Sequence, residues 1–202
     1  MAMYFAQVRG TLSAAEITRR TAELQTIPAA LERVLALEPQ LRDLARKYSE
    51  SDDFLFLGRG VHYPIALDGA LKLKEVSYVH AEGYPSGEMP HGPKALIDEN
   101  LPVVILASRD PDDEGSMLRY ERTLANMKEV KARSGKVIAL ANEGDRQVAA
   151  LADHVIALPA CSELLLPVLE IVPLQLFAYF VAVTRGLDVD NPRNLAKAVL
   201  QE

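Results

Sequence analysis

The segment from Asp53 to Glu75 reads DFLFLGRGVHYPIALDGALKLKE, and this segment decides the fold of the chain. Its apolar run, Phe54 to Leu57, stops at a glycine pair, which is typical of a buried strand that ends in a loop before a helix. Proteins with parallel sheets place their chemistry just past such strand ends. Lys72 and Glu75 are three residues apart and share one face of the expected helix. We therefore expect both side chains to lie near the end of this strand.

Composition indicates an ordinary soluble globular protein. The chain has 202 residues, of which 25% are charged and 49% apolar, with a net charge of −6. That charge offers no basic surface for nucleic acid and disfavours an anionic membrane. Cys161 is the single cysteine, so an internal disulfide or a cysteine-rich metal site is excluded, and a cytoplasmic location fits best. The apolar stretch from Leu164 to Val183 contains two prolines and Glu170, which predicts a core helix rather than a membrane span.

Unbroken apolar runs separated by helical patterns predict the architecture. Such runs are typical of parallel strands that are covered on both faces. We expect a three-layer α/β/α sandwich of flavodoxin-like winding around a five-stranded parallel sheet, with N-terminal helices before it. The expected units are a helical segment over residues 1–48, the sandwich over 49–187 and a tail over 188–202. The expected strands are Phe54–Leu57, Val79–Tyr84, Pro102–Ala107, Lys136–Ala141 and His154–Leu158.

The N-terminal segment carries its own helix signals. Ser13 and Glu16 have the spacing of a capping box, which predicts a helix start at Ser13. A second helical stretch, Ile27 to Tyr48, is expected to be interrupted at Pro39. At the other end, Gly186 is expected to terminate the last long helix.

Three motifs follow one another along the chain. They are GRGxxYPIALxGALKLKE from Gly58, HAEGYxxGExxHGP from His80, and DxDxPRNLAK from Asp188 to Lys197. Together they closely resemble the isomerase part of the glucosamine-6-phosphate synthase family, the glutamine–fructose-6-phosphate aminotransferases, in the second of its two sugar-isomerase (SIS) domains. The resemblance covers about the last three quarters of the chain, and residues 3–48 match the family's joining segment.

The resemblance implies an activity and a larger protein. Family members use ammonia from glutamine to convert fructose 6-phosphate to glucosamine 6-phosphate, the entry step of amino-sugar synthesis. Their first SIS half and their glutaminase domain, whose nucleophile is an N-terminal cysteine, have no counterpart here. Since Met1-Ala2 is no such nucleophile, we expect the chain to be a fragment that is inactive in amide transfer by itself.

The resemblance also implies the site residues. Glu75 corresponds to the carboxylate that moves a proton between C1 and C2 of the sugar, and Lys72 to its helper. His91 corresponds to the imidazole that assists ring opening in the neighbouring subunit, which implies a homodimer. Lys197 corresponds to the lysine that forms an imine with the open-chain ketose, and Ala196 lines the site. No cofactor and no metal are implied.

Outside these motifs the same residues would have ordinary interpretations. A single K-x-x-E pair such as Lys72 and Glu75 is usually a solvated ion pair. An isolated loop histidine such as His91 is usually a turn residue, and a lysine near a chain end such as Lys197 is usually solvated. Only the three motifs together favour catalysis.

The phosphate-binding loop departs from what a sugar phosphate needs. SIS loops that bind phosphate are rich in serine, threonine and glycine, but the segment from Ser108 to Glu114 contains four acids. Gly58-Arg59-Gly60 is a weak alternative because it is too short for a known phosphate-binding fingerprint. We therefore expect this chain alone to bind sugar phosphate poorly.

The remaining reactive residues support no further site. No basic residue is near Cys161 in sequence, which favours a packed thiol, and Tyr63 and Tyr78 are expected in the core or an interface. The other histidines show no metal-ligand spacing, so no metal is expected; they are His62, His80 and His154. Two other functions stay open: a non-catalytic SIS module that binds sugar phosphate or mediates dimerisation, and a related sugar-phosphate deaminase or deglycase.

Overall fold

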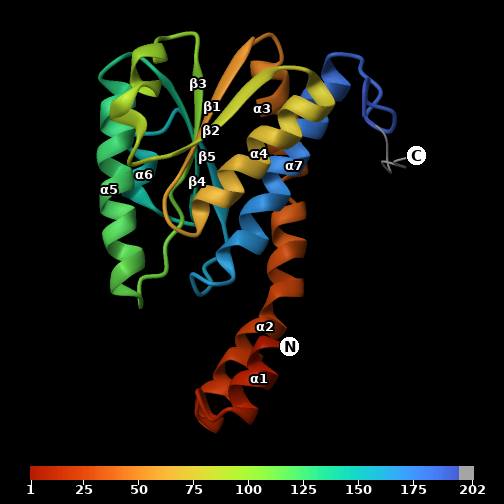
Figure 1. Ribbon diagram of the computed structural model, residues 1–202. Helices are drawn as coiled ribbons and strands as arrows, with labels where there is room; N and C mark the ends of the chain where they lie inside the picture. The colour runs from red at the N-terminus through yellow and green to blue at the C-terminus, as the bar shows by residue number, and fades with distance from the viewer. Residues whose placement is uncertain (196–202) are drawn as a thin grey trace, which may run out of the picture.

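The apolar runs of the sequence form five parallel strands at the centre of the chain (Figure 1). The computed structural model describes residues 1–195. The strand order is β2-β1-β3-β4-β5, which is the flavodoxin-like order, and this confirms the predicted fold class. The strands are β1 (Asp53–Gly58), β2 (His80–Pro85), β3 (Pro102–Leu106), β4 (Lys136–Asn142) and β5 (His154–Leu158).

Helices cover both faces of the sheet. Alternate residues of β1 point to opposite sides, so Phe54 and Phe56 pack toward α4 and α7 while Leu55 and Leu57 pack toward α5. The helices are α1 (Ala2–Val8), α2 (Ala14–Leu35), α3 (Glu38–Tyr48), α4 (His62–Ser77), α5 (Glu114–Lys131), α6 (Arg146–Ala149) and α7 (Leu166–Thr184), with two 3₁₀ turns, η1 (Met89–His91) and η2 (Pro93–Leu96). Two apolar cores result, one on each face of the sheet.

The N-terminal helices confirm one predicted boundary and correct another. Ser13 caps α2 as expected, because its Oγ accepts a hydrogen bond from the Glu16 backbone N–H at 3.2 Å. The predicted interruption at Pro39 is wrong: α2 ends at Leu35, and Pro39 lies in the first turn of α3. A proline is tolerated there because the first helical N–H groups have no intrahelical partner. Together, α1 and the first half of α2 project away from the sandwich (Figure 1).

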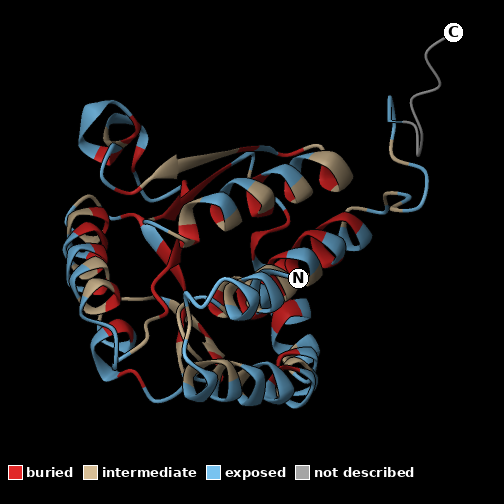
Figure 2. Cartoon of the chain, turned by 60° about the horizontal axis from the view of Figure 1, so that its bottom comes forward, coloured by how far each residue is buried: buried red, intermediate tan, exposed pale blue. Residues whose placement is uncertain are grey.

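Gly69 allows α4 and α7 to approach each other closely over β1. The inner faces of both helices are buried (Figure 2). A Cβ atom added at Gly69 would lie 2.7 Å from Leu174 Cδ1 and 3.2 Å from the Phe56 ring. Both neighbours are themselves buried, so they have little room to move. The glycine of the GALKLKE motif is therefore a packing requirement.

We predict that Gly69→Ala destabilises the protein, although alanine is the better helix former. The overpacked contact should cost about 1–3 kcal/mol, more than the roughly 1 kcal/mol that alanine gains in helix propensity. Urea unfolding monitored by circular dichroism measures the change. Gly115→Ala is the matched control, since its Cβ would meet only side-chain atoms of Arg119 and Asp113. An unchanged or higher unfolding midpoint for Gly69→Ala would contradict the packing role.

α7 is the one helix within residues 1–195 that is long and apolar enough to cross a membrane by length and composition. It is largely a core helix, as the sequence predicts: 56% of its apolar 18-residue stretch is buried, and it packs against α3 and α4. Arg185 follows its last turn and donates hydrogen bonds to the carbonyl oxygens of Ser49, Ser51 and Ser77. One guanidinium thus ties the end of α7 to the ends of α3 and α4.

Candidate functional site

Lys72 and Glu75 form a direct ion pair on α4. Lys72 Nζ lies 2.8 Å from Glu75 Oε2, and the two side chains are 36% and 29% exposed. The hydrogen bond to Glu75 is the main cause that raises the pKa of Lys72, and burial opposes it. Leu71, which directly precedes Lys72, and Leu67, one turn before Leu71, stay exposed on the same helix. An ammonium and a carboxylate in contact can pass a proton between themselves and a bound ligand.

The position of this pair corrects the expectation that it lies just past the end of the first strand. α4 starts after the carboxyl end of β1 and runs back antiparallel to it, as a crossover helix must. The helix ends at Ser77. Three residues later His80 begins β2 and pairs with Asp53 at the start of β1. Lys72 and Glu75 occupy the last two turns of α4 and so lie toward the amino edge of the sheet.

The C-terminal motif is anchored beside this pair. The Arg193 backbone N–H donates to Tyr78 Oη at 2.8 Å, and the Arg193 guanidinium lies 4.1 Å from the centre of the Tyr78 ring. Tyr78 has a left-handed backbone conformation, with φ of 60°, and caps α4 three residues after Glu75. Residues 188–195 are thereby brought to the end of the helix that carries the pair.

Lys197 and Ala196 lie outside the described residues. The anchoring contact was not expected from the sequence, where Tyr78 had only a core or interface role. A residue pair separated by 115 positions leaves no local signal.

His91 lies apart from the Lys72–Glu75 pair in the chain. It ends η1, whose Met89 is packed into the core on the α5 side of the sheet, whereas α4 covers the other face. The His91 side chain is exposed, and it forms no hydrogen bond or ion pair with any of residues 1–195. Within one chain, therefore, the structure joins Lys72 to Glu75 but does not bring His91 to them.

The acidic loop after β3 is closed by its own contacts. Asp113 caps α5 by accepting from the Ser116 N–H at 2.6 Å, and Asp110 accepts from the Glu163 N–H at 3.1 Å. Arg119 pairs with both Glu163 and Asp113. The carboxylates of this loop would repel a phosphate, whose weak binding to this chain stays a prediction.

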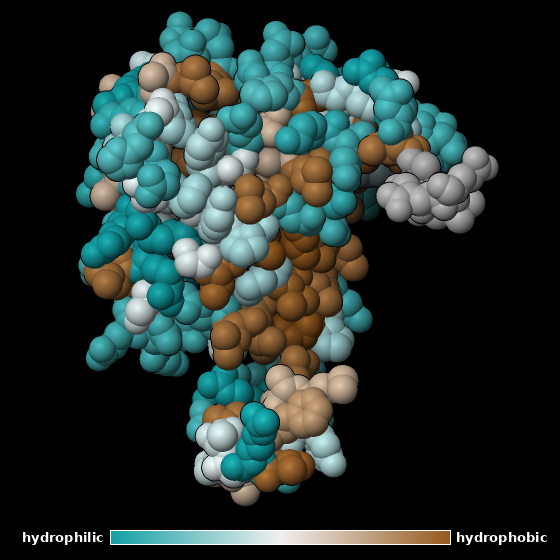
Figure 3. Space-filling model, in the orientation of Figure 1, coloured by the Kyte–Doolittle hydropathy of each residue, from teal (hydrophilic) through white to brown (hydrophobic). Residues whose placement is uncertain are grey.

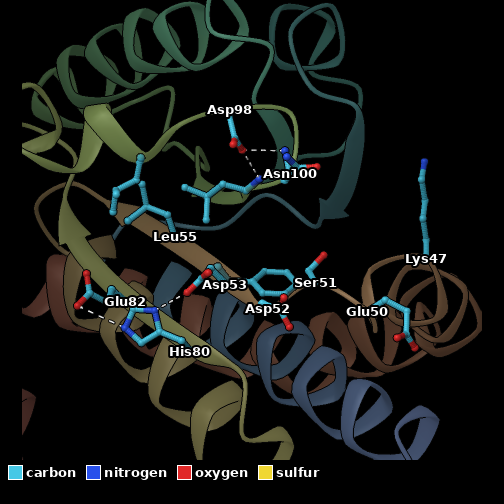
Figure 4. A pocket seen from close by; sticks show the side chains of 13 residues that line it. Lys47, Glu50, Ser51, Asp52, Asp53, Leu55, His80, Glu82, Asp98 and Asn100 are labelled. Atoms are coloured by element: carbon cyan, nitrogen blue, oxygen red, sulfur yellow. Dashed lines mark hydrogen bonds and ion pairs between the residues drawn. The ribbon is translucent and has the colours of Figure 1, made fainter.

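A cavity of about 700 Å³ opens at the amino edge of the sheet (Figure 4). His80 Nδ1 contacts Asp53 at 2.6 Å and its Nε2 lies 3.7 Å from Glu82. The other carboxylates that line the cavity belong to Glu50, Asp52 and Asp98. Five acids against His80 and Lys47 would repel a phosphate, and neither member of the α4 ion pair lines the cavity. It is therefore a poor candidate for a sugar-phosphate site. Residues 1–195 contain no cluster of three or more side chains suited to hold a metal ion.

Two further features involve titratable side chains: the partly buried Cys161 and the buried His62–Glu170 pair. Burial, with repulsion from Glu170, raises the pKa of Cys161 to about 12, so this thiol is protonated at neutral pH, as a packed thiol should be. His62 Nδ1 contacts both oxygens of Glu170, at 2.8 and 2.9 Å, and both residues are buried. This pair leaves no local signal in the sequence because its members are 108 residues apart.

The fold and these motifs define the class of protein. The chain belongs to the SIS domain family, which matches residues 47–185. It is 52% identical over all 202 residues to a glutamine–fructose-6-phosphate aminotransferase (isomerizing) of Thermus thermophilus, and 48% identical to the enzyme of that name from Mycobacterium leprae. The chain spans 32% of the length of each of these curated relatives.

A solved structure agrees with these relatives. The C-terminal domain of glucosamine-fructose-6-phosphate aminotransferase from Francisella tularensis superposes with a TM-score of 0.83 at 39% identity. The match covers 94% of this chain and 51% of that one. The resemblance stated from the three motifs is thereby confirmed.

Proposed function

We propose that this chain is the second SIS half of a glutamine–fructose-6-phosphate aminotransferase and supplies its isomerase acid-base residues. The observation that carries the proposal is a contact between the helix that bears Glu75 and the C-terminal motif. Tyr78, three residues after Glu75, accepts a hydrogen bond from the backbone N–H of Arg193. The relatives that match the whole chain bear the name of this activity. In the longer protein, fructose 6-phosphate and ammonia from glutamine would give glucosamine 6-phosphate, in the cytoplasm.

Each proposed side chain has a role that its chemistry suits. Glu75 moves a proton between C1 and C2 of the open-chain sugar, and Lys72, in contact with it, stabilises its charged form. Lys197 forms an imine with the ketose carbonyl, and Ala196 lines the same site. His91 assists ring opening from a second copy of the chain, which fits its location across the sheet from α4 and makes the active unit a homodimer.

The surface around the pair supports a partner domain. Figure 3 shows apolar side chains gathered over the exposed faces of α4 and α7, and Leu67, Leu71 and Val168 are more than 40% exposed there. A contiguous apolar surface of this kind is typical of an interaction site. The first SIS half, with its phosphate-binding loop, would cover it and enclose Glu75. The glutaminase domain would complete the enzyme.

A chimera tests this function directly. In it, the chain replaces the matching segment of the Thermus thermophilus relative, to which it is 52% identical. We expect the chimera to form glucosamine 6-phosphate from fructose 6-phosphate and glutamine, as measured by product chromatography. The unmodified relative is the positive control, and the relative without this segment is the negative control. A folded, dimeric chimera that hydrolyses glutamine but forms no glucosamine 6-phosphate would refute the proposal.

One observation favours a second candidate, a non-catalytic SIS module that binds sugar phosphate or mediates dimerisation. The Lys72–Glu75 pair is about one-third exposed, as expected for a surface ion pair. The chimera distinguishes the two functions, because a module of this kind would restore dimerisation without product formation.

A further inference from the structure

Arg59 carries a half-buried charge that no carboxylate in the described chain neutralises. It follows the carboxyl end of β1, and one terminal nitrogen of its guanidinium donates to Asn126 Oδ1 at 3.2 Å. Its Nε is fully buried and has no hydrogen-bond partner within residues 1–195. Leaving a buried donor on a cation unpaired is costly, so such groups are normally matched by an anion.

A second unpaired arginine stands next to it. Arg122 lies on α5, four residues before Asn126, so it shares the helix face that contacts Arg59. It is exposed and forms no ion pair with the described part of the chain. Burial is the main cause that lowers the pKa of Arg59, and repulsion from Arg122 lowers it further. Two like charges held together in this way favour an anion between them.

Arg119, a neighbouring arginine on α5, differs from Arg59 and Arg122 in having carboxylate partners. Arg119 lies one turn before Arg122 on α5 and is neutralised by Glu163 and Asp113. The fold therefore supplies carboxylates to Arg119, whereas neither Arg122 on α5 nor Arg59 after β1 receives one from the described residues.

The Arg59 guanidinium packs against the chain that follows β2. A Cβ at Gly87 would lie 3.3 Å from one terminal nitrogen of Arg59, so glycine allows the guanidinium to lie against the chain after β2. Ser86 precedes Gly87 in the chain and is fully buried, and its Oγ has no partner within residues 1–195. Arg59 lies at the point where the strand order reverses, because β2 pairs with one side of β1 and β3 with the other. Ligands of open α/β sheets bind at that point.

We propose that Arg59 and Arg122 form a binding site for a phosphoryl group at the carboxyl end of β1. Two planar guanidinium groups favour a dianion with several acceptor oxygens over a single carboxylate. The ligand is either inorganic phosphate or the phosphoryl group of a phosphorylated sugar. The site lies at the sheet edge opposite to the Lys72–Glu75 pair, so it does not depend on the proposed isomerase function.

Titration of the ¹⁵N-arginine-labelled chain with inorganic phosphate, at constant ionic strength balanced with chloride, tests the site. The Nε–Hε resonance of Arg59, assigned by its loss in Arg59→Lys, should shift and saturate. Arg122→Gln should weaken phosphate binding at least tenfold, and it should fold because Arg122 is exposed. Arg146→Gln is the matched control: it removes one exposed arginine of α6 that forms no ion pair with residues 1–195, and it should leave the titration unchanged.

A parallel titration with fructose 6-phosphate identifies the source of the phosphoryl group. Equal affinities indicate recognition of the phosphate alone, and tighter binding of fructose 6-phosphate indicates a sugar phosphate; both support the site. A shift that does not saturate, or that is equal in Arg122→Gln, overturns it. So does a silent titration in which Arg122→Gln weakens dimerisation in sedimentation experiments, because the two arginines then bind a carboxylate of a second copy.

Discussion

Glu75→Gln, made in the chimera, is expected to reduce formation of glucosamine 6-phosphate by about 10²–10⁴-fold, the usual contribution of a positioned acid-base group. The amide keeps the shape of the side chain and its contact with Lys72 but cannot accept a proton. Glutamine hydrolysis should continue, because that reaction belongs to another domain in the proposed enzyme. Product chromatography measures the first activity, and glutamate release measures the second.

Stability must stay nearly constant for this result to be meaningful. The Lys72–Glu75 pair is partly exposed, so its loss should cost less than about 1 kcal/mol. Glu121→Gln is the matched control, because Glu121 is exposed on α5 and forms no ion pair with the described residues. Equal loss of both activities in Glu75→Gln, with a lower unfolding midpoint, would show a structural role for Glu75.

Borohydride reduction with fructose 6-phosphate is expected to label Lys197 of the chimera, and Lys197→Arg should reduce this labelling to background. Arginine keeps the positive charge but cannot form the imine that borohydride reduces. Peptide mass spectrometry locates the adduct. The expected loss is complete because no other residue is proposed to bond to the sugar.

Lys74→Arg is the control for this experiment. Lys74 is exposed on α4, next to Glu75 in sequence, so it reports labelling by proximity alone. Labelling that persists in Lys197→Arg would exclude the imine role of the C-terminal motif. So would an adduct found on Lys74 to the same extent as on Lys197. The first experiment would then be left to distinguish an acid-base site from a surface ion pair.

Interactions between positions that are close in sequence were predictable. The Ser13 cap joins residues three apart, and so does the Lys72–Glu75 ion pair. The strands followed from continuous apolar runs, since a strand covered on both faces must be apolar on both. The predicted end of a helix at Pro39 failed, because a proline interrupts a helix only beyond its first turn and the true start of α3 depends on packing.

The position of the site depended on contacts between distant residues. The direction of α4 moved Lys72 and Glu75 away from the strand end at which they were expected. Tyr78 meets Arg193 across 115 positions, and Arg59 meets Asn126 across 67.

The sequence by itself determined the parallel α/β sandwich and the spacing of the ion pair, because hydrophobic periodicity and helical spacing are local properties of the chain. Only the tertiary structure decided which motifs meet, which arginines receive a carboxylate and which face His91 occupies. Those outcomes depend on how helices pack across the sheet, and the packing is settled by many weak contacts between residues far apart in the chain.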